Sequence, residues 1–118
     1  MKLLKENDKI TVDQLQQMSA KMFEKIVKAV VDVEQEIMVV DAAMHADQEL
    51  FLLEELFSQQ NNLWCINLVP LKFGTDGFVV FDSMINLRPG WGNFSRGVDN
   101  PAIQKKIKLI VAKFVGSL

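Results

Sequence analysis

The sequence has few of the residues from which small proteins build disulfide or metal frameworks. Its 118 residues include one cysteine, Cys65, and one histidine, His45. A lone cysteine cannot form an intramolecular disulfide, and zinc sites normally use paired Cys or His motifs. We therefore predict a fold held by its hydrophobic core alone, with no cofactor, since a chain of this length buries enough surface to be stable without such staples.

A strong net charge and long apolar segments are also missing. The 13 Lys and Arg residues nearly balance the 15 Asp and Glu residues, which argues against a wholly basic surface for nucleic acid. No apolar run approaches the roughly 20 residues that cross a bilayer. Charges interrupt residues 1–8, where a secretory signal would be continuously apolar. We predict a single cytoplasmic domain over residues 1–118, without a membrane partner.

Two segments have the spacing of amphipathic helices. Thr11 and Gln14 stand at the spacing of a capping box, which predicts a helix start. A second helix is predicted to have Pro101 as its first residue, with Asn100 or Asp99 as its cap, and to end near Gly116. The apolar stripes of the two helices are Val12, Leu15, Met18, Met22, Phe23 and Ile26, and Ile103, Ile107, Ile110, Val111, Phe114 and Val115.

Runs rich in β-branched residues predict the strands. Residues 26–33 and 37–40 indicate a hairpin whose loop is longer than two residues, because the intervening sequence lacks an Asn-Gly or Asp-Gly turn. Residues 63–69 and 78–88 predict two further strands, ended by Pro70 and Pro89. Residues 47–57 fit either a helix or a buried strand, and their Leu and Glu content favours a helix.

Several segments together resemble a family of short prokaryotic proteins that is catalogued as a domain of unknown function. They are residues 28–34, 45–47, 63–68, 81–89 and 92–98. The resemblance covers nearly the whole chain and implies no established activity. It implies that residues 48–56 are a strand paired with 63–69, although the family's Gly-Ser turn is replaced here by Leu56 and Phe57.

We follow this implication and predict an α+β fold. It comprises an N-terminal helix, an antiparallel β-meander of about five strands and a C-terminal helix packed on the sheet. Alternation along residues 78–88 places Asp82, Asn86 and Arg88 on one face. Polar residues also interrupt earlier strands, at Asp32, Asp41 and Asn67, where a buried group needs a partner. If the strand register allows it, the two sets form one polar patch.

The connection formed by residues 88–100 is the predicted functional region. It is long and contains three of the six glycines, whose backbone freedom allows amides to converge on an anion. The candidate ligand-binding residues are Asp82, Asn86, Arg88, Asn93, Ser95 and Arg96. A purely structural alternative is that the loop folds Trp91 and Phe94 over the core and uses Arg96 as a surface clamp.

The leading functional hypothesis is a noncatalytic binding or regulatory module, which recognises an anionic small molecule or a protein through residues 88–97, with a homodimer as one form of partner. The alternative is a small hydrolase-type enzyme that uses His45 or Asp82 as a base and Arg88 or Arg96 to stabilise negative charge. A nucleic-acid binder that uses Arg96 and the C-terminal lysines is less favoured.

A metal site is the weakest of the alternatives. His45, Asp47 and Glu49 would lie on one side of an extended segment and could ligate a hydrated divalent ion.

Overall fold

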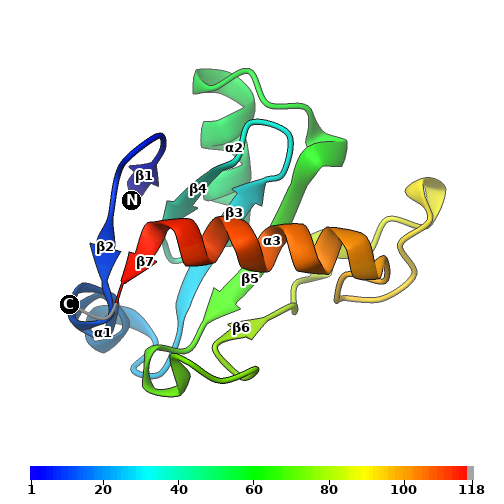
Figure 1. Cartoon of the computed structure of the whole chain (residues 1–118). Helices are drawn as coiled ribbons and strands as arrows, with labels where there is room; N and C mark the ends of the chain where they lie inside the picture. The colour runs from blue at the N-terminus through cyan, green and yellow to red at the C-terminus, as the bar shows by residue number, and fades with distance from the viewer. Residues whose placement is uncertain (117–118) are drawn as a thin grey trace.

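The protein is described by a computed structural model that covers residues 1–116 (Figure 1). These residues form three α-helices, α1 (Val12–Met22), α2 (His45–Glu55) and α3 (Pro101–Phe114). None of these helices is long and apolar enough to cross a membrane. The strands are β1 (Lys2–Leu4), β2 (Ile10–Thr11), β3 (Val27–Asp32), β4 (Ile37–Val40), β5 (Leu63–Leu68), β6 (Val79–Val80) and β7 (Val115–Gly116).

Five strands make one antiparallel sheet in the order β1-β4-β3-β5-β6. Strand β3 is central and pairs with β5 over its whole length, from Val27 opposite Leu68 to Asp32 opposite Leu63. β4 and β5 lie on opposite sides of β3, and the connection from β4 to β5, which contains α2, passes over β3. The strand order therefore differs from that of a simple meander. β6 pairs with only two residues of β5, so most of that strand's outer edge has no strand beside it.

The helices cover both faces of the sheet (Figure 1). Because side chains alternate along a strand, Ala29 and Val31 of β3 join the core beneath α1 and α3, whereas Val30 joins the core beneath α2. Phe114 of α3 and Leu52 of α2 are fully buried in these two cores. The predicted C-terminal helix packed on an antiparallel sheet is confirmed.

The local signals for helix starts and for the hairpin are also confirmed. The Thr11 hydroxyl accepts from Gln14 N at 3.1 Å and the Gln14 side chain accepts from Thr11 N at 2.9 Å, which completes the capping box. The Asn100 side chain accepts from Ala102 N at 2.9 Å, before Pro101 at the first helical position. β3 and β4 form the expected hairpin, with a loop at residues 33–36.

The strand implied for residues 48–56 is wrong, because this segment belongs to α2. Gln48 and Leu52 stand four residues apart and are both fully buried, which is the period of a helix against a sheet. The fifth position in the sheet is taken by β1, which the sequence did not predict and which pairs Lys2 with Val40.

The long strand predicted at residues 78–88 is wrong beyond Val80. The hydroxyl of Ser83 accepts from Ile85 N at 3.3 Å, and this local bond starts the 3₁₀ helix Met84–Asn86 in place of further strand pairing. A second 3₁₀ helix follows at Pro89–Trp91. The alternation expected for a strand is therefore lost, and Asp82 is exposed whereas Asn86 is fully buried.

Candidate functional site

The candidate residues lie in the segment 82–99, and the side chain of Asn86 pairs with the open edge of β5. Asn86 accepts from Cys65 N at 2.9 Å through Oδ1 and donates to Cys65 O at 2.8 Å through Nδ2. A carboxamide carries both a donor and an acceptor, so it pairs with a backbone residue as a neighbouring strand would. Asn86 has no exposed surface and also donates to Arg96 O at 3.0 Å. Its role is to satisfy backbone groups.

Asn93 organises the rest of the segment from the inside. Its Nδ2 donates to Asn86 O at 2.7 Å and to Gly97 O at 2.9 Å, and its Oδ1 accepts from Asp99 N at 2.8 Å. Its backbone pairs with that of Arg88 in both directions. Asn93 is only 3% exposed. Two of the six predicted binding residues are therefore buried supports of the loop.

Arg88 is held at the start of β5, away from the other charged candidates. Its guanidinium donates to Gln60 O at 2.7 Å and to Leu63 O, and it lies 4.4 Å from the Trp64 ring centroid and 5.5 Å from that of Trp91. Burial lowers the pKa of Arg88 from its ordinary value. Arg88 thus caps backbone carbonyls and stacks on aromatic rings.

The exposed polar candidates are paired with each other or with the loop itself. Arg96 Nε contacts Asp82 Oδ1 at 2.7 Å, and both side chains are about half exposed. The Ser95 hydroxyl donates to Asp99, which also accepts from Phe94 N at 2.6 Å. These two bonds, the hydroxyl first, lower the pKa of Asp99. Arg96 Nε and the Ser95 hydroxyl are therefore already paired within the segment, and Arg96 is linked to Asp82 as a surface clamp.

The predicted catalytic residues are only partly brought together, because Asp82 pairs with Arg96 whereas Arg88 is held at the start of β5. His45, the first residue of α2, is 6% exposed, its Nε2 lies 2.8 Å from Ile66 O, and burial lowers its pKa, which favours the neutral ring. Asp82 is near enough to His45 to oppose this shift, but Arg88 is held elsewhere. Burial also raises the pKa of Cys65 to about 12, so its thiol is not a nucleophile at neutral pH.

The proposed ligands His45, Asp47 and Glu49 do not share a side, because they stand on a helix and not on a strand. Successive helical residues turn by about 100°, so Asp47 points away from the other two. No group of three metal-ligating side chains occurs in residues 1–116. The metal alternative depended on an extended segment and is wrong in its geometry.

The polar strand residues do not form one patch either. Asp32 accepts from Glu34 N, Gln35 N and the Ser58 hydroxyl, so the predicted need for partners is met at the β3–β4 turn. Asn67 lies at the opposite end of the paired strands and donates to Asp82 O at 3.2 Å. Hydrogen bonding within turns explains Asp32 without a ligand.

Apolar side chains, which the sequence interpretation did not single out as binding groups, face solvent on this segment. Met84 is 62% exposed, Leu87 40% and Phe94 70%. Met84 begins the 3₁₀ helix Met84–Asn86, and Leu87 follows the last residue of that helix. Leu87 and Phe94 directly flank the Arg88–Asn93 bridge in the chain. We name Met84, Leu87 and Phe94 the outer strip.

Trp91 adds a fourth exposed apolar side chain at the tip of the segment, where it is 57% exposed. In Figure 1 this tip, drawn in yellow, lies beyond the N-terminal end of α3. The alternative that the loop folds Trp91 and Phe94 over the core is therefore wrong. Two aromatic residues in a glycine-containing connection were the sequence signal for an exposed apolar surface. The sequence alone does not show whether an aromatic ring points into the core or towards solvent.

Comparison with known proteins identifies the family. The model of the family described as "Protein of unknown function (DUF5674)" matches residues 4–114. The chain belongs to DUF5674. The match spans the whole sheet except for its first two residues, all three helices and the entire segment 82–99, so the loop is part of the DUF5674 domain. The expected membership of a family of unknown function is confirmed.

Searches of the curated proteins and of the solved structures gave no significant match to this DUF5674 protein.

Replacing Asn86 is predicted to unfold the segment and weaken the whole fold. Asn86→Ala leaves Cys65 N and Cys65 O without partners, and each unpaired buried group costs about 1–3 kcal/mol. We expect a loss of about 3 kcal/mol or more in the free energy of unfolding, measured by urea denaturation. The exposed Asn61→Ala control should change it by less than about 0.5 kcal/mol. Equal effects of the two substitutions would contradict the role of Asn86.

The loop's own hydrogen bonds predict a pH effect centred on Asp99. Because its pKa is lowered in the folded state, the ionised carboxylate stabilises the loop fully above its unfolded pKa of about 3.9, and this contribution is lost as pH falls through the lowered folded pKa. Ser95→Ala should move the Asp99 pKa back towards its ordinary value, and Ser95→Thr should not. Carboxyl NMR titration tests this, and an unchanged pKa in Ser95→Ala would refute it.

Proposed function

We propose that this protein is a noncatalytic binding module whose partner is another protein, held through the outer strip and Trp91. The observation that carries the proposal is the contrast between the two sides of segment 82–99. Its inner side is fixed by buried Asn86 and Asn93, and its outer side exposes four large apolar side chains within eleven residues. Clustered exposed apolar groups on a fixed frame are typical of protein interfaces.

A protein partner is favoured over a small anion for an energetic reason. An anion would meet the Asp82 carboxylate beside Arg96 and the Asp99 carboxylate beside Ser95, and both carboxylates would repel it. Burying Met84, Leu87 and Phe94 requires no bond to break and gains about 25 cal/mol for each Å² of apolar surface removed from water. Aromatic residues and Met are also the side chains enriched in interface centres.

A second copy of this chain is one partner that fits, because an apolar strip can pack on itself across a twofold axis. The formal charge of −2 sets up little repulsion between two copies. The prokaryotic origin and cytoplasmic location stay predictions from the sequence. So do the hydrolase and nucleic-acid alternatives, which no contact among the described residues favours over protein binding.

Site-specific photo-crosslinking tests the proposal. A photoreactive phenylalanine analogue is placed at Met84 in the outer strip or at Leu109 on α3, two positions that are each 62% exposed. In cells of the source organism, the Met84 position should give discrete crosslinked species, identified by mass spectrometry as another protein or as a second copy of this chain. The Leu109 position is the control and should not give them.

The same crosslinks should disappear when Leu87→Asp is added, because a charge is then placed beside the crosslinker in an apolar contact. Phe94→Ala should weaken binding of the identified partner about tenfold or more, as expected for an aromatic residue at an interface centre. Identical products from the Met84 and Leu109 positions, or no products from either, would contradict the proposal.

A further inference from the structure

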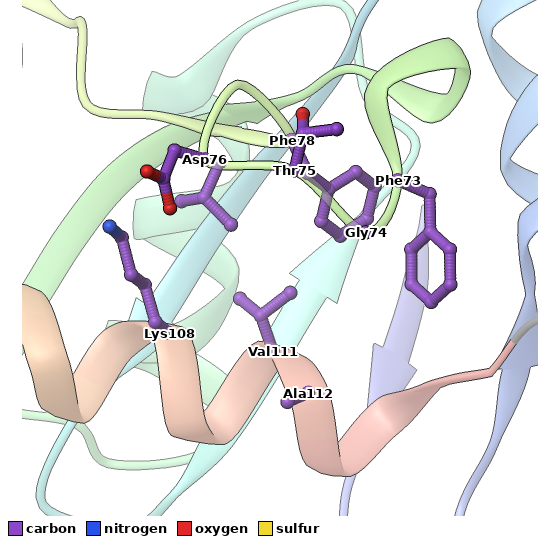
Figure 2. Close-up of a pocket in the computed structure, with 9 residues that line it drawn as sticks. Phe73, Gly74, Thr75, Asp76, Phe78, Lys108, Val111 and Ala112 are labelled. Atoms are coloured by element: carbon purple, nitrogen blue, oxygen red, sulfur yellow. The ribbon is translucent and has the colours of Figure 1, made fainter.

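A cavity separate from segment 82–99 lies between α3 and residues 73–79 (Figure 2). Its volume is about 230 Å³. The walls are mainly apolar, with Val111 and Ala112 on α3 facing Phe73, Phe78 and Val79. None of its lining residues belongs to the outer strip, so the cavity is distinct from the protein-binding surface proposed above.

The size of the cavity suits a single ring or a branched aliphatic group. An engineered apolar cavity of about 150 Å³ in another protein holds benzene, whereas sites for drug-sized ligands usually begin near 300 Å³. Phe78 is 7% exposed and forms an edge-to-face pair with Phe73 at 5.1 Å, which gives the cavity an aromatic wall. A ligand here has an apolar body of about the size of one aromatic side chain.

The mouth of the cavity carries one charge of each sign. Asp76 and Lys108 both line the cavity (Figure 2). Among residues 1–116 neither of the two charged groups makes an ion pair within 4.0 Å, and Lys108 Nζ lies 5.9 Å from the Phe81 ring. The lining of this apolar cavity therefore includes one charged side chain of each sign, and neither is in an ion pair with a described residue.

The loop that carries Asp76 is held in place by local bonds. The Thr75 hydroxyl donates to Lys72 O at 2.7 Å and accepts from Gly77 N at 3.2 Å, and Phe78 N donates to Thr75 O. Gly74 adopts a φ of +87°, which a residue with a side chain would adopt only with strain. The opposite wall is fixed because Val111 is buried in the main core. The cavity is thus formed before any ligand arrives, which reduces the entropy cost of binding.

We infer that this cavity binds a small zwitterion with an apolar body, of the class of aromatic or branched-chain α-amino acids. The apolar body enters between Phe78 and Val111, the ligand's carboxylate faces Lys108, and its ammonium group faces Asp76. An anion alone would meet repulsion from Asp76, and a cation alone would meet repulsion from Lys108. A head group with both charges complements both residues.

Titration of the isotope-labelled protein with L-phenylalanine, followed by amide NMR, tests the inference. Saturable shifts should centre on Gly74, Thr75, Phe78 and Val111, with a dissociation constant on the order of 1 mM for so small a ligand. The probes 3-phenylpropionate and 2-phenylethylamine each lack one charge and should bind about 2- to 5-fold more weakly, the range for an exposed ion pair.

Three variants connect these affinities to the named groups. Ala112→Phe places a ring in the cavity from an exposed helical position and should abolish the shifts. Lys108→Met should weaken L-phenylalanine about 2- to 5-fold without weakening 2-phenylethylamine, and Asp76→Asn should weaken it similarly without weakening 3-phenylpropionate. Lys105→Met, on the same helix but outside this cavity, is the matched control and should change nothing.

Several results would overturn the inference. They are shifts that rise linearly without saturating, shifts that persist in Ala112→Phe, and equal affinities for L-phenylalanine and for the two singly charged probes. None of these results bears on crosslinking at Met84, so failure here is distinguishable from failure of the proposed protein-binding function.

Discussion

The pairing of the Asn86 side chain with the backbone of Cys65 is the interaction on which the structure of segment 82–99 depends. Along one edge, strand β5 pairs with β3 over its full length. Along its other edge, β6 pairs only with Asn67 and Leu68. Without Asn86, both backbone groups of Cys65 would be buried and unpaired. One carboxamide thus makes the two backbone hydrogen bonds that a neighbouring strand would make to Cys65. The residues after Asn86 need not continue as a strand.

The remainder of segment 82–99 follows from that attachment. The Asn93 side chain donates hydrogen bonds to the carbonyl groups of Asn86 and Gly97. The Arg88 guanidinium donates to the carbonyl of Leu63 at the start of β5. Polar residues in this region consequently serve the fold, and the apolar residues serve the surface. This inverts the usual expectation that polar residues in a loop bind the ligand and apolar residues form the core.

The sequence predicted those parts of the fold that depend on neighbouring residues. The capping box of Thr11 and Gln14, the Asn100–Pro101 helix start and the β3–β4 hairpin each rest on interactions within a few residues, and each is confirmed. These signals remain readable because no distant contact competes with them.

The two failures have different causes, a contact between residues far apart in the chain and a misleading family resemblance. Residues 78–88 have the alternating pattern of a strand, but the strand ends at Val80. Beyond it, the Asn86 side chain hydrogen bonds to the backbone of Cys65, 21 residues earlier in the chain. Residues 48–56 have helical composition, and the resemblance to the family misdirected their assignment towards a strand. The sequence could not decide the roles of Asn86 and Asn93, because an asparagine looks the same in sequence whether it binds a ligand or a carbonyl group.

Amide hydrogen exchange at Cys65 tests most directly whether a side chain substitutes for a strand in this sheet. If Asn86 holds the Cys65 amide as described, that amide should exchange as slowly as the amide of Val30 in the central strand β3, because both would open only with the core. Exchange of the Cys65 amide as fast as that of Val80 on the short edge strand β6 would contradict the account.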